Sequence, residues 1–348
     1  MDRHIINQDT PLLDALARLN ALSGEVMTLL AVNDDGEMTG TLTDGDIRRN
    51  LLKGVSLESP VSAAMHRDFC WLEAGNVDIA GLRSIRERGI RLIPLLDIRR
   101  RIVRILDTDV TRTLLPVSAV LMAGGKGERL RPLTLDRPKP LLKVGGKPII
   151  DYNIEALAAV GIDDVTVTTN YLADMIHEHF STPVSGITVK CVREPAPLGT
   201  IGSLGLVPHC KGGVTLLMNS DLLTTVSFED MYLKHMSENA DITIAAIPYN
   251  ISVPYAILKT DGTEVKEMEE KPTYSYYANA GIYMINNSLL EGFDGTERMD
   301  APDFIESALA NGRKVVYFPI NGTWIDIGNP SDFRHACELM RHHHDLSI

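Results

Sequence analysis

The sequence has 348 residues, a length that suits two domains better than one. Its formal net charge of −12 argues against nucleic acid as a partner, and no apolar run approaches the roughly 20 residues that a membrane span needs. The polar amino-terminal residues show no signal-peptide pattern. The cysteines, which show no C-x-x-C spacing, are Cys70, Cys191, Cys210 and Cys337. We therefore expect a cytoplasmic protein with reduced cysteines and with no nucleic-acid or membrane partner.

The first third of the chain contains a weak internal repeat. Segment 29–46 matches segment 92–109 in a single register. Each copy predicts a helix followed by two strands, and apolar residues recur at helical spacing over residues 11–23 and 77–88. Residues 33–36, Asn-Asp-Asp-Gly, predict a hairpin turn between the two strands of the first copy. Because one copy buries too little apolar surface alone, we expect the two to pack as a pseudo-symmetric pair.

This repeat resembles a tandem CBS (cystathionine-β-synthase-type) module, which has an α+β fold. The resemblance lies in residues 40–48, Gly-Thr-Leu-Thr-Asp-Gly-Asp-Ile-Arg, which are close to the strand-to-helix signature of that family. It implies a regulatory nucleotide bound by Thr43, Asp46 and Arg48 in the first copy, whereas the second copy lacks the glycine. A purely structural dimerisation module is the alternative, and both interpretations remain open. We assign this module to residues 1–113 and expect a homo-oligomer.

After an expected linker at residues 107–116, the sequence changes character. Strands are predicted at residues 117–122, 165–169, 187–192 and 214–218, and helices at 149–160 and 173–180. The alternation implies an α/β domain over residues 117–348, with a doubly wound, mostly parallel sheet. Ligands of such sheets bind at the carboxyl ends of the strands. The sequence places a glycine-rich loop, residues 219–221 and the turn before Glu194 at such ends.

Residues 121–141 are the most informative segment. Three glycines lie within residues 124–127, directly after an apolar strand, so backbone N–H groups can approach a ligand closely. Four basic residues follow, from Arg129 to Lys139, and two prolines around Lys139 stiffen that part of the chain. The pattern is neither a Walker A loop nor a dinucleotide-binding G-x-G-x-x-G. Backbone donors beside guanidinium and ammonium groups predict a site for a small polyphosphate ligand.

Two aspartates supply a candidate metal site. Asp221 directly follows the apolar strand at residues 214–218, and Asp326 lies in the segment 322–328, Gly-Thr-Trp-Ile-Asp-Ile-Gly. Either aspartate alone is better explained as the cap of a turn or helix. If the two meet beside the phosphate loop, they form a two-carboxylate site suited to Mg²⁺, which takes its other ligands from water and substrate phosphates.

These motifs, in this order, resemble the sugar-1-phosphate nucleotidyltransferases, also called nucleotide-sugar pyrophosphorylases. The resemblance covers residues 117–335, and the motifs that carry it are residues 124–130, 137–140, 198–202, 219–221 and 270–272 together with 324–328. Glu128 departs from the family, which usually has Thr or Ser there, and Ser220 stands where the family often has Gly. We expect Glu128 to point away from the triphosphate or to contact a neighbour.

The resemblance implies an enzyme that transfers a nucleotidyl group from a nucleoside triphosphate to a hexose- or hexosamine-1-phosphate, giving a nucleotide-sugar and pyrophosphate with Mg²⁺ as cofactor. The implied site residues are Leu121, Ala123, Gly124, Gly125, Gly199 and Thr200 for the nucleotide, Arg129 and Lys139 as catalytic cations on the phosphates, Asp221 and Asp326 for Mg²⁺, and Glu270, Lys271 and Asn279 for the sugar phosphate.

With a CBS pair fused ahead of it, this domain resembles bacterial enzymes that make GDP-sugars such as GDP-glucosamine. Mannose-1-phosphate guanylyltransferases share much of the motif set. GTP is therefore the favoured nucleotide, while UTP, dTTP and CTP remain open. A non-catalytic nucleotide sensor, in which both domains bind ligands, is the alternative from another functional class. The retention of both the basic residues and the aspartates argues against that alternative.

Overall fold

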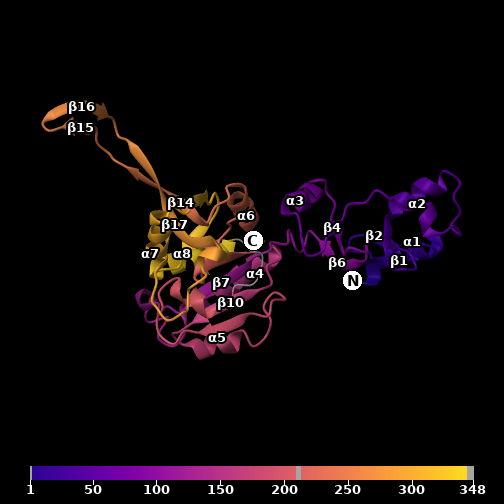
Figure 1. Cartoon of the computed structure of the whole chain (residues 1–348), viewed down its shortest axis with the longest axis horizontal. Helices are drawn as coiled ribbons and strands as arrows, with labels where there is room; N and C mark the ends of the chain where they lie inside the picture. The colour runs from indigo at the N-terminus through magenta and orange to yellow at the C-terminus, as the bar shows by residue number, and fades with distance from the viewer. Residues whose placement is uncertain (1, 209–212, 343–348) are drawn as a thin grey trace. The chain divides into compact units, whose positions relative to one another are not determined.

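The computed structural model describes residues 2–208 and 213–342, and the chain divides into two compact units, Met1–Leu114 and Leu115–Ile348 (Figure 1). None of the described helices is long and apolar enough to cross a membrane. Of the cysteines, Cys210 lies outside the described residues, and the other three are free thiols.

The amino-terminal unit contains two copies of one small motif. The first copy comprises β1 (Ile5–Asn7), α1 (Leu12–Ala21), β2 (Thr28–Val32) and β3 (Met38–Thr43), followed by α2 (Asp44–Leu51). The second comprises β4 (Leu72–Glu73), α3 (Ile79–Glu87), β5 (Leu92–Leu96) and β6 (Ile102–Asp107). In each three-stranded sheet the first pair of strands is parallel and the second antiparallel. The predicted repeat is confirmed, and each copy also begins with a short strand that the sequence analysis did not predict.

The two copies pack against each other, as expected. A shared apolar cluster joins Leu30 and Met38 of the first copy to Leu92 and Leu96 of the second. The backbone N–H of Met38 also donates to the carbonyl oxygen of Arg100 at 2.9 Å. Since each sheet covers the apolar face of the other, neither copy has to bury that face alone. Membership of the CBS family itself stays a prediction.

Seven of the described strands of the carboxy-terminal unit form one sheet in the order β11-β10-β7-β12-β17-β14-β18. Their bounds are β7 (Ser118–Ala123), β10 (Val165–Thr169), β11 (Lys190–Arg193), β12 (Val214–Asn219), β14 (Ile242–Ser252), β17 (Thr273–Asn286) and β18 (Val315–Pro319). β17 runs antiparallel to both of its neighbours, and the other neighbouring pairs are parallel. The expected mostly parallel α/β sheet is therefore confirmed.

The helices of this unit are α4 (Ile149–Ala159), α5 (Ala173–His179), α6 (Phe228–Ser237), α7 (Ala301–Ala310) and α8 (Pro330–His342). The predicted end of α4 is explained by Gly161, whose φ of +73° is left-handed and favours glycine. The Gly161 N–H donates to the carbonyl oxygen of Ala158, and the next N–H, of Ile162, donates to that of Leu157, both at 3.0 Å. These bonds satisfy carbonyl groups that the helix end would otherwise leave free.

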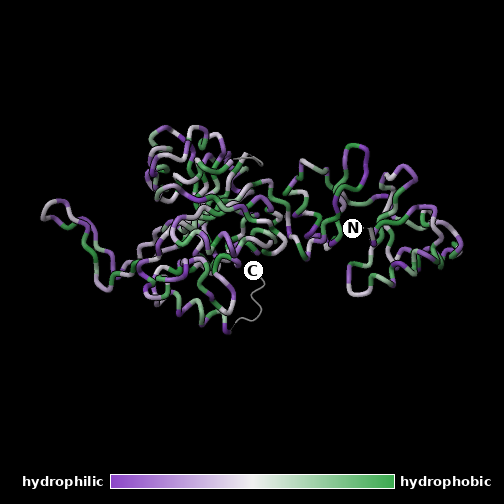
Figure 2. Tube along the Cα trace, turned by 90° about the horizontal axis from the view of Figure 1, so that it is seen from below, coloured by the Kyte–Doolittle hydropathy of each residue, from purple (hydrophilic) through white to green (hydrophobic). Residues whose placement is uncertain are grey.

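A long two-stranded arm leaves the sheet. β14 and β17 stay paired as far as Ser252 and Thr273, beyond which β15 (Ile257–Asp261) and β16 (Glu264–Glu269) form a hairpin. Figure 1 shows this hairpin at the far end of the arm, and Figure 2 shows hydrophobic and hydrophilic residues along it. The hairpin is almost entirely exposed. β17 thus begins well before the small-residue segment at Ala278 that the sequence analysis took as the strand start.

Candidate active site

A cavity of about 430 Å³ opens at the carboxyl ends of the central parallel strands. The ends of β7, β12 and β11 meet there because these strands run in the same direction within one sheet. The residues that line it are Met122, Ala123, Gly124, Gly125, Lys139, Pro140, Glu194, Pro197, Leu198, Gly199, Thr200, Asn219, Ser220, Asp221 and Arg298. Most of the residues predicted for the nucleotide are in this set. Leu121 is different, because it is fully buried inside β7.

The three glycines of the loop differ in their surroundings. A Cβ on Gly124 would lie 2.9 Å from Oε1 of Glu194, whereas Gly125 has open space around it. Gly127 has a φ of +60°, and a Cβ there would lie 3.0 Å from the side chain of Thr134. The loop is therefore closely packed on one side and open on the side where a phosphate would approach.

The two predicted metal ligands lie side by side. β13 (Leu222–Thr224) pairs antiparallel with β19 (Trp324–Asp326), and Leu222 lies opposite Asp326. The N–H of Ile327 donates to the carbonyl oxygen of Asp221 at 3.2 Å. One short ladder therefore brings two carboxylates from distant parts of the sequence to the same point.

Lys139 lies between these carboxylates. Its Nζ forms an ion pair with Oδ2 of Asp221 and lies 3.6 Å from Oδ1 of Asp326. Oδ1 of Asp221 and Oδ1 of Asp326 are buried and have no hydrogen-bond partner among the described residues. Burial raises the pKa of the Asp221 carboxyl above its ordinary value, and Lys139 opposes that rise. Buried acceptor oxygens without donors suit a bound cation.

One apolar cluster holds all of these polar groups in place. Its buried members are Leu130, Leu142, Val144, Ile149, Tyr152, Leu223, Ile327 and Ala336. Leu130 follows Arg129, and Ile327 follows Asp326. The cluster therefore anchors the phosphate loop, the lysine segment and both aspartate strands to one another through residues next to the polar ones.

No cluster of three or more His, Cys, Asp or Glu side chains suited to a metal occurs in the described part of the chain. The Asp221–Asp326 pair offers two protein ligands. That number fits Mg²⁺ in phosphate-transfer sites, where substrate phosphates and water supply the remaining oxygens. The donor set and its unpaired buried oxygens therefore fit this ion.

Both departures from the family pattern have local explanations. Oε1 of Glu128 lies 3.6 Å from Nη2 of Arg131 in an exposed ion pair, so the charge of Glu128 is partly compensated. This is one of the two expected arrangements, in which Glu128 contacts a neighbour. Ser220 is buried, and its hydroxyl donates to the carbonyl oxygen of Met122 at 2.6 Å.

The guanidinium of Arg129 lies beside Gly328. A Cβ built on Gly328 would lie 3.5 Å from Nη2 of Arg129 and 3.6 Å from Oδ2 of Asp326.

On the opposite wall, Gly199 and Thr200 are fixed to the start of α7. Gly199 has a φ of +79°, and a Cβ there would lie 2.5 Å from a backbone oxygen of Met299. The Thr200 N–H donates to Oδ1 of Asp300 at 3.1 Å. Arg298 also lines the cavity and donates to the other carboxylate oxygen of Asp300 at 3.0 Å. The sequence analysis missed Arg298, which lies outside every motif that it used.

Glu194 is a second residue whose role the sequence analysis missed. Its side chain is buried in the cavity wall, and burial raises its pKa. The N–H of Leu198 donates to its Oε2 at 3.3 Å, which favours the charged form. An acidic residue just after a strand that ends at the cavity was the available signal. Glu194 offers a pair of acceptor oxygens at the nucleotide end of the site.

The three residues predicted for the sugar phosphate do not lie together at the cavity. Glu270 and Lys271 lie at the base of the exposed hairpin, and neither lines the cavity in the described part of the chain. Asn279 lies further along β17, where its Nδ2 donates to the Tyr283 hydroxyl and its Oδ1 accepts from the Gly281 N–H. The structure therefore separates Glu270 and Lys271 from the other predicted site residues.

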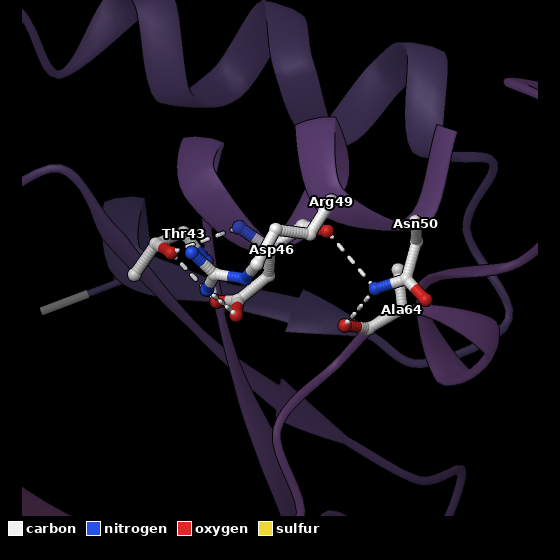
Figure 3. A network of polar contacts seen from close by, with 5 residues as sticks. All are labelled: Thr43, Asp46, Arg49, Asn50 and Ala64. Carbon is white, nitrogen blue, oxygen red and sulfur yellow. Dashed lines mark hydrogen bonds and ion pairs between the residues drawn. The ribbon is translucent and has the colours of Figure 1, made fainter. Parts of the chain in front are cut away.

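In the amino-terminal unit, the predicted regulatory residues make contacts at the start of helix α2 and within it. Thr43 and Asp46 form a capping box at the start of α2, in which each side chain bonds to the backbone N–H of the other (Figure 3). Arg49 and Asn50 also donate to Asp46, through its side chain and its carbonyl oxygen. Arg48 pairs instead with Asp44.

A separate cavity of about 540 Å³ lies in the second copy of the repeat. It is lined by Arg86, Gly89, Arg91, Thr108, Asp109 and Arg112. Arg91 pairs with Asp109 at 2.6 Å. This is the copy that the sequence analysis considered the poorer binding site, because it lacks the signature glycine.

Known proteins resemble part of the chain. A mannose-1-phosphate guanyltransferase from Yarrowia lipolytica is 32% identical over 230 residues, covering 62% of this chain and 62% of that protein. Mannose-1-phosphate guanylyltransferase 1 from Arabidopsis thaliana is 32% identical over 229 residues, covering 62% and 63%. This chain thus spans less than two thirds of the length of these curated relatives.

The solved structure of HddC from Yersinia pseudotuberculosis superimposes with a TM-score of 0.50 at 24% identity, covering 64% of this chain and 99% of that one, and so shares the fold. Residues 118–342 match the family model described as nucleotidyl transferase. That match covers more than half of the sequence, and this chain therefore belongs to the nucleotidyl transferase family.

Proposed function

We propose that this protein transfers a guanylyl group from GTP to a hexose- or hexosamine-1-phosphate, giving a GDP-sugar and pyrophosphate. The observation that carries the proposal is the meeting of Asp326 with Asp221 and Lys139, two residues that line the glycine-lined cavity. The similarity to two mannose-1-phosphate guanylyltransferases supports both the reaction class and the choice of GTP.

In the proposed reaction, a phosphate oxygen of the sugar-1-phosphate attacks the α-phosphorus of GTP in line. The new P–O bond forms as the bond to the bridging oxygen of the β-phosphate breaks, and pyrophosphate leaves. The second pKa of a phosphate monoester is about 6, so the nucleophile is mostly a dianion at neutral pH and needs no general base. The chemical difficulty is to bring two polyanions together, which requires positive charge at the site.

Each part of the site has a role in this scheme. Asp221 and Asp326 would hold Mg²⁺, which when bound would neutralise phosphate charge and stabilise the charge on the leaving pyrophosphate. Backbone N–H groups of Gly124 and Gly125 would bind phosphate oxygens from the open side of the loop. Lys139 and Arg129 would contact phosphate oxygens and stabilise the negative charge that grows on them.

The base preference has a candidate determinant in Glu194. Its carboxylate offers acceptor oxygens in the cavity wall, and guanine presents an exocyclic amino group as a donor beside its ring N–H. Uracil and thymine present one ring N–H between two carbonyl oxygens, and these oxygens would face the carboxylate unfavourably. Glu194 therefore supports GTP over UTP and dTTP.

For the sugar phosphate we retain Glu270, Lys271 and Asn279 as the proposed ligands. Lys271 would neutralise the phosphate and Glu270 would accept hydrogen bonds from sugar hydroxyls. Asn279 lies in β17 two residues before Gly281, and Gly281 packs against Asn219 of the cavity, since a Cβ there would be 2.5 Å from the Asn219 amide. Of the three ligands, Asn279 is thus the one tied by packing to the cavity.

For the amino-terminal unit we propose a regulatory nucleotide. Three arginines and one aspartate, Asp109, line this cavity, and the excess of positive charge favours a phosphate-bearing ligand there. Thr43, Asp46 and Arg48 of the first copy remain the alternative site. Calorimetric titration of AMP, ATP, GMP and GTP into the full chain, with Arg86→Ala and Asp46→Ala as variants, separates the two. Loss of one binding step in a single variant identifies the site, and the absence of any second site supports the purely structural module.

The deciding experiment measures pyrophosphate release. GTP, UTP, dTTP and CTP are each tested with a panel of hexose- and hexosamine-1-phosphates in the presence of Mg²⁺. Release that depends on both GTP and one sugar-1-phosphate supports the proposal, and release with another nucleotide corrects the base. If all pairs are inactive while nucleotides still bind, the chain is a non-catalytic nucleotide sensor and the proposal is wrong.

A further inference from the structure

Lys139 occupies the place where a metal ion would be expected. Its ammonium contacts Asp221 and lies 3.6 Å from Oδ1 of Asp326, so one cation serves both carboxylates. The lysine side chain is 12% exposed, that of Asp221 is 19% exposed and that of Asp326 is 39% exposed. Water therefore compensates the charges of Lys139 and Asp221 only weakly, and these two groups depend on each other for charge balance.

A divalent cation and this ammonium cannot share the site. Mg²⁺ binds oxygens at about 2.0–2.1 Å, so an ion held by one oxygen of each aspartate would fall within a few ångströms of Nζ. Two positive charges at that separation repel, and the poor exposure of Lys139 and Asp221 leaves little water to screen the repulsion beside them. The lysine must move away when the metal enters, and a buried ammonium that moves needs a new anion.

We propose that Lys139 is a placeholder cation that balances the charge of Asp221 and Asp326 until metal and nucleotide arrive. In the free protein it opposes binding of a divalent cation alone. The triphosphate supplies the anion to which Lys139 transfers, which frees the two carboxylates for the metal. This inference rests on the proposed function, because the triphosphate is the ligand that draws Lys139 away.

The proposal makes metal and nucleotide binding mutually dependent. If the nucleotide raises the affinity for metal, the metal raises the affinity for nucleotide by the same factor. Lys139 thus has two opposed effects that a simple phosphate-binding lysine lacks. It weakens binding of the metal alone, and it strengthens the coupling between metal and nucleotide.

Lys139→Met tests this directly, because it keeps a long apolar stem and removes the charge. Mn²⁺ is the probe, and electron paramagnetic resonance counts the free ion. Without nucleotide, we expect Lys139→Met to bind Mn²⁺ at least about tenfold more tightly than the unchanged protein, since the competing charge is gone. With a non-hydrolysable GTP analogue, we expect tighter Mn²⁺ binding in the unchanged protein and a much smaller gain in the variant.

Two further variants serve as controls. Lys143→Met removes an exposed lysine that is not part of the carboxylate pair, and its Mn²⁺ affinity should match that of the unchanged protein. In Lys139→Met/Asp221→Asn the gain in Mn²⁺ affinity should vanish, since one ligand is gone. If Lys139→Met folds poorly, Mn²⁺ should raise its melting temperature more than that of the unchanged protein.

Equal or weaker Mn²⁺ binding by Lys139→Met, or no Mn²⁺ binding by any of these proteins, overturns the placeholder role. That failure differs from failure of the proposed function. An unchanged protein that releases pyrophosphate from GTP and a sugar-1-phosphate keeps the proposed function whatever the Mn²⁺ titrations give. An unchanged protein that is inactive with all substrate pairs loses it.

Discussion

Leu222 and Asp326 lie opposite each other in the two-stranded sheet of β13 and β19, and this register sets the carboxylates of Asp221 and Asp326 beside a single lysine. Backbone hydrogen bonds fix both strands, and an apolar cluster that includes Leu223 and Ile327 packs beneath them. The site therefore depends on backbone placement, so changes of side-chain charge can be made there without moving the strands.

The first prediction follows because the charges of the two aspartates can be changed without moving their strands. Asp221→Asn and Asp326→Asn keep the size of each side chain and remove one negative charge at the proposed metal. We expect each to lower turnover in the pyrophosphate-release assay by at least about a hundredfold, because a positioned electrostatic contact is lost. The circular dichroism spectrum should stay unchanged.

Asp303→Asn is the matched control, since Asp303 is an exposed residue in the first turn of α7. It should turn over at the rate of the unchanged protein. Near-normal turnover by either Asp221→Asn or Asp326→Asn would contradict the metal assignment.

Much of this site could be predicted because its residues lie within short motifs. The glycine loop and Asp221 each follow an apolar stretch that the sequence marks as a strand, and Lys139 lies between two prolines in a basic segment. The meeting of Asp221 and Asp326 was a hypothesis from the sequence, since no local pattern states which distant strands pair. Its geometry comes from the register of β13 and β19.

The features that the sequence did not predict are set by tertiary packing. The length of the arm could not be inferred, because the residues of β14 and β17 beyond the sheet have no core to give them a recognisable apolar alternation. Glu270 and Lys271 were therefore assigned to a site from their motif alone. Thr43 and Asp46 show a similar limit, since a capping box and a ligand-binding signature use the same residue types.

Gly124 and Gly125 should differ sharply when each is changed to alanine. A Cβ on Gly124 would lie 2.9 Å from Oε1 of Glu194, whereas nothing lies within 4 Å of a Cβ on Gly125. We expect Gly124→Ala to displace the Glu194 carboxylate and to lower the free energy of unfolding by about 1–3 kcal/mol. Gly125→Ala should change it little. Chemical denaturation of the ligand-free proteins measures both, and equal losses would show that the contact with Glu194 is unimportant.

Glu194→Gln should change base selection. The variant keeps the size of the side chain but replaces one acceptor oxygen with a donor amide, which no longer matches the two donors of guanine. We expect kcat/KM for GTP to fall by about tenfold or more, because a buried polar pair becomes mismatched. ITP, which lacks the exocyclic amino group, should lose much less. A GTP-to-ITP preference that survives the substitution would exclude Glu194 from base recognition.

Asp46→Ala tests the structural role of the capping box in the amino-terminal unit. The carboxylate of Asp46 accepts from the Thr43 N–H, the Thr43 hydroxyl and Arg49. Loss of a cap of this kind costs about 0.5–2 kcal/mol, so thermal unfolding of the unit should shift to lower temperature. Asp44→Ala, which removes the half-buried partner of the exposed Arg48, should have a smaller effect. Equal shifts would show that the capping box adds nothing beyond a surface ion pair.

His235 should make the stability of the carboxy-terminal unit depend on pH. It is 1% exposed, and its ring nitrogens contact Oγ1 of Thr243 at 2.8 Å and Oδ1 of Asn286 at 3.0 Å. Burial lowers its pKa in the folded state, so the unfolded chain takes up a proton at a higher pH than the folded one does. The stabilising contribution is therefore complete above the ordinary imidazole value of about 6.5 and is lost as the pH falls through the native pKa.

His235→Gln removes the titrating group while keeping a polar side chain that can bond to one of the two partners. At pH 7.5 we expect the variant to be less stable by about 1 kcal/mol, the usual cost of a lost hydrogen bond. Between pH 6.5 and pH 5 that difference in stability should shrink or reverse. Only the unchanged protein loses stability from this source, because its unfolded chain takes up a proton on His235 before the folded protein does. Urea denaturation of both proteins at several pH values measures the difference. A difference that stays constant over this range means that His235 does not govern the acid sensitivity of the fold.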